Sequence, residues 1–187
     1  WENVESGDLI YMMGGTYEYD ERQYLSGKNG DIGDTIKLYA YPGQTPIITR
    51  SDNFTQPSSW PFGFIVVEGD YIHVKGLEVA YYTQLTSNVW EGLRAYGCNH
   101  CVFELLNIHH CGMGMQLTNC DDCSVLNSDF HHNQDPLTSY GDGDGFGVDC
   151  TNATTNRTNT IDGCRFWWNS DDGLDAWGEE STVIIQN

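Results

Sequence analysis

The chain has 187 residues and a formal net charge of −19 at pH 7, from 27 acidic and 8 basic residues. This charge excludes a general nucleic-acid binder and a protein that associates with anionic membranes, because both surfaces are themselves negative. No apolar run approaches membrane-spanning length and no signal peptide is visible, so we expect any targeting segment to have been removed.

The N-terminal third predicts short strands separated by turn residues. We expect five of them, each brief and apolar, at residues 8–12, 36–41, 47–48, 64–67 and 71–74. Residues 1–8 and 17–31 are expected to form an entry coil or a cap. We therefore predict a single domain over residues 1–187, with irregular coils or a cap over 1–60 and regular coils over 61–187.

Two repeated motifs organise the rest of the chain. A glycine followed by apolar, variable and apolar residues occurs four times, starting at Gly92, Gly114, Gly145 and Gly173. A second motif precedes each copy, at residues 74–79, 103–108, 125–130 and 161–166. The cleanest spacing is 22 residues, and longer spacings imply loop insertions at residues 135–143 and 151–159.

The segments are short, are separated by Asn, Asp and Gly turn residues and show no helical periodicity, which favours β structure. A repeat of about 22 residues then predicts an all-β parallel β-helix in which each coil stacks on the last. The leucine and asparagine ladder of a leucine-rich repeat is missing, and a β-sandwich is the structural alternative. Residues 182–185 (TVII) begin another coil before the sequence stops at Asn187. Since solenoids need terminal caps, we expect the β-helix to continue beyond residue 187, or another chain to cover this coil by self-assembly.

Two acidic segments, GDGDGFG (141–147) and NSDDGLDAW (169–177), have aligned aspartates. Asp144 and Asp172 each precede a motif glycine, so they are expected to stack in consecutive coils about 4.8 Å apart. Stacked carboxylates repel one another unless a cation neutralises them, and Ca²⁺ accepts such oxygen ligands. The alternative is that Asp-Gly pairs simply form turns. The candidate ligands are Asp144, Asp171, Asp172 and Asp175, with Asp142 and Asp149 as weaker candidates.

Four of the seven cysteines form two Cys-x-x-Cys pairs, Cys98 with Cys101 and Cys120 with Cys123. The spacing is also that of zinc ribbons. However, Cys98 and Cys120 are one 22-residue period apart, as are Cys101 and Cys123, so each cysteine should stack on its equivalent. The stacked neighbours are candidates for disulfides, with free thiols or a metal clamp as the alternatives.

Two further sets of residues occupy repeated or exposed positions. The pairs His109-His110, His131-His132 and Trp167-Trp168 lie at equivalent places in three coils. They suggest either turn packing, which is the simpler interpretation, or a site for a transition metal or proton transfer. Three sequons in expected loops permit N-glycosylation of a secreted eukaryotic protein, at Asn53, Asn152 and Asn156.

The run from SGDLIYMMGGTY through LYAYPGQTPII and YIHVKGLEV to GDGDGFG and NSDDGLDAW resembles the right-handed β-helix polysaccharide lyases of the family 9 pectate lyase type. The resemblance covers most of the chain, and the two acidic motifs are its most specific part. It implies that Asp144, Asp171, Asp172 and Asp175 bind a catalytic Ca²⁺. It also implies a secreted, extracellular enzyme that performs β-elimination on a uronic-acid polymer such as pectate.

The resemblance also implies a catalytic lysine on a coil beyond the second acidic motif, and this chain shows none there. Its lysines, Lys28, Lys37 and Lys75, do not lie on the matching strand. Arg94 projects from the same strand face two coils before Asp144 and is a candidate contact for an acidic sugar. Arginine is normally protonated, so we do not assign it as the base.

Two other functions fit parts of the pattern. A non-catalytic β-helix module that binds glycan, or that assembles as an extracellular fibre or adhesin, would explain the missing lysine. A hydrolase of the polygalacturonase type would need paired catalytic acids, which Asp144 and Asp171 or Asp172 could imitate. Four clustered acids suit a metal better than such a pair.

Overall fold

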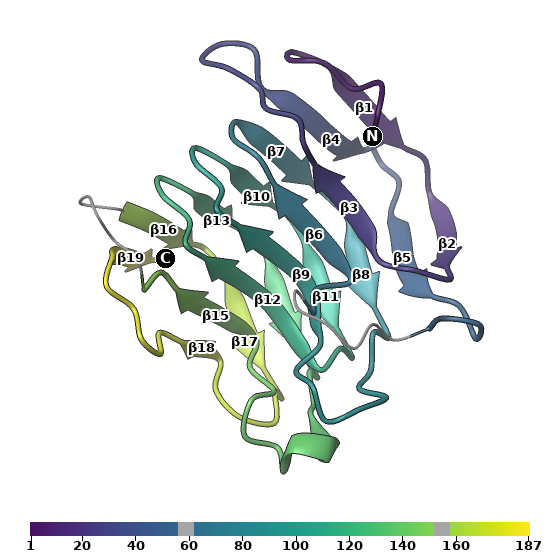
Figure 1. Cartoon of the computed structure of the whole chain (residues 1–187), viewed down its shortest axis with the longest axis vertical. Coiled ribbons are helices and arrows are strands. Elements are labelled where there is room, and N and C mark those ends of the chain that lie inside the picture. The colour runs from purple at the N-terminus through teal and green to yellow at the C-terminus, as the bar shows by residue number, and fades with distance from the viewer. Residues whose placement is uncertain (56–61, 152–157) are drawn as a thin grey trace.

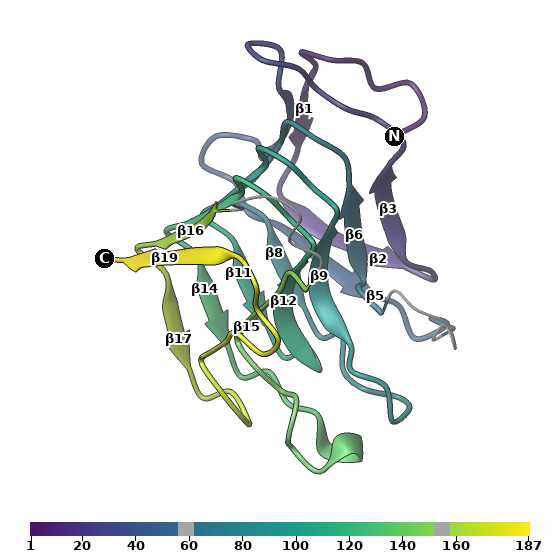
Figure 2. The ribbon, with the colours of Figure 1, turned by 60° about the vertical axis from the view of Figure 1, so that its left-hand side comes forward.

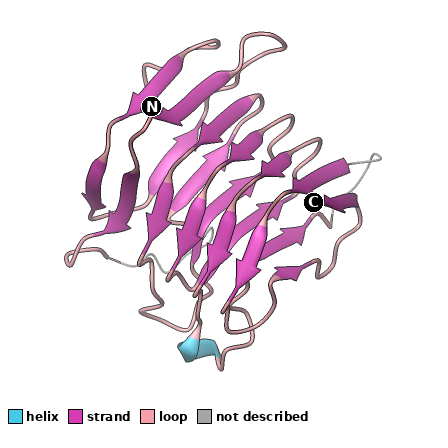
Figure 3. Ribbon diagram, turned by 180° about the vertical axis from the view of Figure 1, so that it is seen from behind, coloured by secondary structure: helices cyan, strands magenta, loops and turns pink. Residues whose placement is uncertain are grey.

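The computed structural model describes residues 1–55, 62–151 and 158–187 (Figure 1). The chain winds through three parallel sheets and contributes one strand to each sheet in turn, so that equivalent strands of successive coils lie side by side (Figures 1 and 3). Figure 2 shows the coils from another side, with the three sheets facing one another across the interior. This is the parallel β-helix that the repeat predicted. No helix within the described ranges is long and apolar enough to cross a membrane.

The sheets are named here in the order in which the chain enters them. The first contains β1 (Leu9–Met12), β4 (Ile36–Ala40), β7 (Ile72–Lys75), β10 (Val102–Glu104), β13 (Ser124–Leu126), β16 (Thr158–Asp162) and β19 (Thr182–Gln186). The second contains β2 (Gly15–Tyr19), β5 (Pro46–Arg50), β8 (Glu78–Ala80), β11 (Asn107–His109), β14 (Asp129–His131) and β17 (Arg165–Trp167). The third contains β3 (Gln23–Ser26), β6 (Ile65–Glu68), β9 (Glu91–Tyr96), β12 (Met113–Thr118), β15 (Phe146–Asp149) and β18 (Leu174–Asp175). A short 3₁₀ turn, η1 (Pro136–Thr138), lies between β14 and β15.

Strand register confirms the alignment of the repeats. Ile108 pairs with Val79 on one side and with Phe130 on the other, and Phe130 pairs with Phe166. Val102 pairs with Ser124, which is the 22-residue step, whereas Ser124 pairs with Thr160, because the loops of that coil are longer. Equivalent residues therefore stack directly even where insertions separate them in the sequence.

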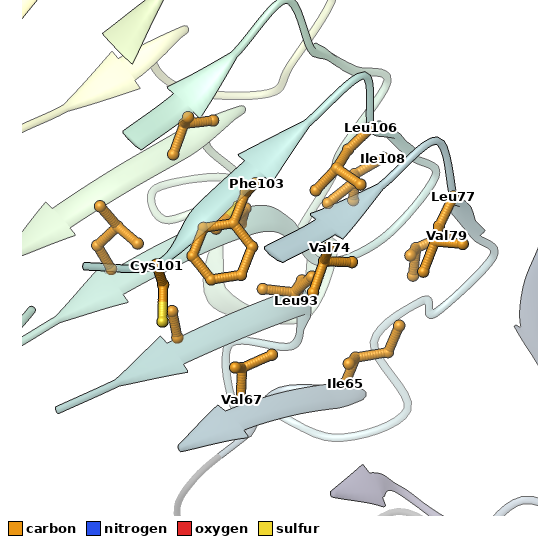
Figure 4. Packing of buried hydrophobic residues seen from close by; sticks show 14 of the residues in the cluster. Ile65, Val67, Val74, Leu77, Val79, Leu93, Cys101, Phe103, Leu106 and Ile108 are labelled. Atoms are coloured by element: carbon orange, nitrogen blue, oxygen red, sulfur yellow. The ribbon is translucent and has the colours of Figure 1, made fainter. Parts of the chain in front are cut away.

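The interior is filled by apolar side chains that stack from coil to coil. One such column runs along the first sheet, and all of its members are buried: Leu38, Val74, Phe103, Val125 and Ile161. Because side chains alternate between the faces of a strand, every second residue enters this core. Figure 4 shows Val74 and Phe103 packed near Leu93 of the third sheet and Ile108 of the second.

The N-terminal residues follow the same plan with looser packing. Strands β2 and β3 lie within or beside residues 17–31 and complete the first coil with β1. No residue of these three strands is fully buried, whereas β4 begins with the fully buried Ile36. Apart from Val4, which precedes β1, the buried apolar core therefore starts in the second coil.

The motif glycines stack at the entrance to the third sheet. The Gly114 N–H donates to the Asp144 carbonyl (2.9 Å), and the Gly145 N–H donates to the Asp172 carbonyl (3.0 Å). A Cβ at Gly114 would overlap the carbonyl oxygen of Gly145, which is backbone and cannot move aside. Only glycine allows two coils to approach this closely, and the approach sets the position of both aspartates.

We predict that Gly114→Ala lowers the free energy of unfolding by about 3 kcal/mol, because overpacking against backbone forces the coils apart. The matched control is Gly141→Ala, since a Cβ there makes only an ordinary contact with the Thr138 carbonyl oxygen (3.8 Å). Urea denaturation of both variants measures the difference. Equal stabilities for the two variants would contradict the close approach.

Candidate metal centre and groove

The two acidic segments lie side by side at the start of β15 and β18, the last two strands of the third sheet (Figure 1). Phe146 pairs with Leu174, and Gly147 pairs with Asp175. Besides the bond between Gly145 and the Asp172 carbonyl, the Asp172 N–H donates to Asp144 Oδ1 (3.0 Å). Main-chain hydrogen bonds therefore hold Asp144 and Asp172 in the stacked arrangement that their alignment predicted.

Three of the four predicted acids converge. Asp144, Asp171 and Asp172 each place a carboxylate oxygen within 4.8 Å of the others. Asp144 is buried, with 6% of its surface exposed, whereas Asp171 and Asp172 are exposed. Asp175, the last residue of β18, is half-buried and lines the same groove. The arrangement is an all-oxygen donor set with one buried member.

The electrostatics of this group favour a bound cation. The pKa of Asp144 is raised to about 7, chiefly by burial and also by the neighbouring charges of Asp175, Asp171 and Asp172. The hydrogen bond from the Asp172 N–H acts in the opposite direction. The pKa of Asp175 is also raised, first by burial and then by Asp172. The ionisation of Asp144 is opposed by the negative charges of three neighbouring carboxylates. A hard divalent cation bound among the four groups would offset this repulsion.

A buried aspartate that the sequence did not single out organises the loop before β15. Asp135 is fully buried, and its Oδ1 accepts a hydrogen bond from Ser170 Oγ (2.9 Å) in the next coil. Its Oδ2 accepts from the Asp142 N–H (2.9 Å) and from the Thr138 hydroxyl. Asp135 thus ties the inserted loop to Ser170 of the second acidic segment.

An asparagine pair fixes the turn that precedes both acidic segments. Asn133 is fully buried, and its backbone and side-chain N–H groups donate to Asn169 Oδ1 (3.2 and 3.1 Å). Asn133 Oδ1 accepts from the Cys111 N–H (3.1 Å), and Asn169 Nδ2 donates to the Phe130 carbonyl (3.2 Å). The same side-chain type therefore bridges three coils. The sequence does indicate that the two asparagines are equivalent, because Asn133 follows His131-His132 and Asn169 follows Trp167-Trp168.

The acids form one part of a groove of about 780 Å³ along the third sheet. Arg94 lines this groove, and register places it in one row with Gln116, Gly147 and Asp175. Only 7% of Arg94 is exposed, because its guanidinium is bonded to the carboxylate of Glu91, to the Gln116 side chain and to Thr118 Oγ1 (3.2 Å). Other lining residues are Phe62, Met113, Asp142, Asp149 and Trp177.

The cysteine pairs are stacked at a buried corner. Asn99 pairs with Asp121, and Val102 pairs with Ser124, so Cys98 lies next to Cys120 and Cys101 next to Cys123. At most 1% of each of these cysteines is exposed. All four are free thiols in the structure, so the disulfides Cys98–Cys120 and Cys101–Cys123 are not confirmed and stay predictions.

Of the three sequon asparagines, one can be placed. Asn53 is exposed, in a bend after β5 where its backbone N–H donates to Ser51 Oγ (3.1 Å). Asn152 and Asn156 lie outside the described residues.

Comparison with known proteins agrees with the fold and with the resemblance of the motifs. Residues 1–187 match the family described as "Pel9A-like, right handed beta helix region", and the chain belongs to this family. Pectate lyase L of Dickeya dadantii (strain 3937) is 34% identical over 197 residues, which cover 98% of this chain and 42% of that protein.

Two solved structures show the same architecture. A rhamnogalacturonan lyase superimposes with a TM-score of 0.84 and 26% identity, over 100% of this chain and 49% of its own. Pectate lyase Pel9A superimposes with a TM-score of 0.76 and 27% identity, over 98% of this chain and 45% of its own. The right-handed parallel β-helix of the polysaccharide lyase type is therefore confirmed. The chain spans less than half the length of each of these relatives.

We predict that Asn133→Ala lowers the free energy of unfolding by about 2 kcal/mol, because the buried Cys111 N–H loses its partner. A change of this size should lower Tm by roughly 4–8 °C in a domain of this length. The control is Asn53→Ala, which alters an exposed asparagine and should change stability by less than about 0.5 kcal/mol. Thermal unfolding followed by circular dichroism tests both, and an unshifted Tm for Asn133→Ala would refute the structural role of the pair.

Proposed function

We propose that this chain binds Ca²⁺ through Asp144, Asp171, Asp172 and Asp175, and that the adjoining groove acts on a uronic-acid polymer by β-elimination. The observation that carries the proposal is the convergence of three carboxylates at one end of the groove, with a fourth beside them. The polysaccharide lyases to which the chain is similar support the substrate class.

The donor set suits calcium better than a softer metal. Ca²⁺ takes six to eight oxygen ligands in flexible geometry, and carboxylates on two consecutive coils supply several of them, with water completing the shell. When bound, Ca²⁺ supplies positive charge that both attracts a uronate carboxylate and favours loss of the C5 proton. Asp144 anchors the set because it is buried and hydrogen-bonded to the main chain.

The groove offers contacts for a sugar chain beside these acids. Trp177 is 83% exposed and lines the groove, so its ring can stack on a sugar face. Arg94 lies in the same row across the third sheet as Asp175, and Glu91 and Gln116 hold its guanidinium in place. We propose that Arg94, whose guanidinium is held in one orientation, contacts a uronate carboxylate one or more sugars away from the metal.

The proton acceptor is not assigned. Among the described residues that line the groove, none is a lysine or a histidine, and Arg94 is tied to Glu91. Lys37 and Lys75 belong to β4 and β7 of the first sheet, and Lys75 pairs with Glu104. This observation favours a second candidate, a non-catalytic module that binds acidic glycan. A hydrolase is less well supported, because the acids lie within 4.8 Å of one another, closer than hydrolytic pairs.

We also propose that the protein acts outside the cell, where uronate polymers occur. The exposed position of Asn53 within its sequon is compatible with glycosylation in a secretory route. That the protein is a glycoprotein, and that its polymer is one such as pectate, are parts of the same proposal.

We predict one Ca²⁺ bound per chain, with a Kd on the order of micromolar to hundreds of micromolar. Asp172→Asn should weaken binding at least about tenfold, because ligand charge sets calcium affinity while the shape of the side chain is kept. Asp52→Asn is the control, since Asp52 is exposed and lies outside the groove. Isothermal titration calorimetry measures all three proteins. Equal binding by the two variants would place the ion elsewhere.

The reaction is tested by incubating the chain with polygalacturonate and recording the absorbance of unsaturated products. We expect product that depends on Ca²⁺, stops on chelation and falls at least about tenfold in Asp172→Asn, because the metal stabilises the developing charge. Binding of the polymer without product would support the glycan-binding module instead. New reducing ends without absorbance would indicate a hydrolase, and neither binding nor cleavage would overturn the proposed function.

A further inference from the structure

A second group of metal-ligating side chains lies outside the groove, at the end of β11 and β14. His109 pairs with His131 in the second sheet, and their rings stack with centroids 4.8 Å apart at 8°. His110 and His132 follow them and stack in the same way, 4.9 Å apart at 6°. This histidine corner, defined as His109, His110, His131 and His132, therefore consists of two equivalent pairs one coil apart.

Within each pair the two Nδ1 atoms face each other. His109 Nδ1 lies 2.7 Å from His110 Nδ1, and His131 Nδ1 lies 2.7 Å from His132 Nδ1. The backbone makes this possible because His110 and His132 adopt left-handed conformations, with φ of 53° and 55°. These bent turns direct two adjacent side chains toward a common point.

The outer nitrogens of the first histidine in each pair have fixed partners. His109 Nε2 lies 3.2 Å from Glu78 Oε1, and His131 Nε2 lies 3.0 Å from Asn107 Oδ1. Both partners are acceptors, so each Nε2 carries the hydrogen and each Nδ1 presents a lone pair. A histidine that donates its other N–H to a carboxylate or carbonyl is the usual arrangement in metal sites.

The surroundings of His131 and His110 disfavour protonation of these two rings. Burial and the neighbouring histidines lower the pKa of His131 to about 4, while Asp129 acts in the opposite direction. The pKa of His110 is lowered by the same two causes. Neutral imidazole is the form that binds metal. Trp167 stacks on His131 (4.2 Å) and Tyr81 lies against His109 (5.6 Å), so aromatic rings close both ends of that stack.

We propose that each pair of the histidine corner chelates a divalent transition-metal ion such as Zn²⁺ through its two facing Nδ1 atoms. Two nitrogens 2.7 Å apart, each about 2.05 Å from the ion, subtend an angle of roughly 80° at the metal, which suits a chelate. The hydrogen shared by each Nδ1 pair moves to Nε2 of the second histidine when the ion enters. Both Nδ1 atoms then donate lone pairs, and no proton is released.

This site differs in chemistry from the acidic one and does not depend on it. The corner offers nitrogen donors, which suit Zn²⁺ or Cu²⁺, whereas the groove offers oxygen donors, which suit Ca²⁺. Saturating Ca²⁺ therefore occupies the acidic site without competing at the corner. The simpler alternative is that each pair is only a hydrogen bond that packs the turn.

The test is calorimetric titration of Zn²⁺ into the full chain with Ca²⁺ at saturation. We expect the double variant His110→Asn/His132→Asn to lose at least about tenfold in affinity, because one nitrogen of each chelate is removed. Asparagine tolerates the left-handed conformation, so the turns should persist. Circular dichroism of metal-free protein verifies that the variant folds.

The matched control is His100→Asn. His100 also has a left-handed conformation, with φ of 54°, and stacks on Tyr71 rather than on another histidine. We expect its Zn²⁺ affinity to equal that of the parent chain. Absence of Zn²⁺ binding by the parent, or an equal loss in the control, would overturn the proposal. As a second measurement, Cu²⁺ bound to the parent should show nitrogen couplings in its electron paramagnetic resonance spectrum, and oxygen coordination alone would also overturn it.

Discussion

In-register stacking between parallel coils is the constraint on which the rest of this structure depends. Each residue has its equivalent in the next coil as a neighbour, about 4.8 Å away, whatever the length of the intervening loops. For apolar residues such as Val74 and Phe103 the result is a continuous buried column. For polar residues the same spacing brings two or three copies of one functional group together. The chemistry of a polar stack therefore depends on whether its stacked groups can both donate and accept hydrogen bonds among themselves.

The polar stacks of this chain differ in this respect. An amide has both donors and acceptors, so the buried Asn133 can donate to Asn169 and accept from another coil. A neutral imidazole has one of each, and His109 and His110 form a complementary pair. An ionised carboxylate has only acceptors, so Asp144 beside Asp172 needs a donor from outside. The main-chain N–H of Asp172 supplies one, and the remaining negative charge calls for a cation. The acidic stack is thus the one most dependent on a ligand.

Much of this arrangement could be predicted from the spacing of the sequence. Aligning the motif glycines placed Asp144 next to Asp172 and Cys98 next to Cys120, because both belong to regular coils. The roles of Asp135 and Asn133 could not be predicted in the same way. Asp135 lies in an inserted loop, and its partner Ser170 is reached only through the fold. The partners of the histidines, Glu78 and Asn107, resemble ordinary strand residues in the sequence, and only register identifies them.

The turns between the second and third sheets begin alike but differ in length. Between β11 and β12 the chain has only residues 110–112, so the His110 ring stays against His109 and the Cys111 side chain is buried in the core. Between β14 and β15 it has residues 132–145, and this longer segment carries η1 and the first acidic motif outward. Asp135 then fastens the segment to the next coil, which leaves Asp142 and Asp144 along the groove. Both turns therefore begin with a histidine that pairs with the last residue of the preceding strand, His110 with His109 and His132 with His131. Only the longer, anchored turn also carries an acidic motif to the groove.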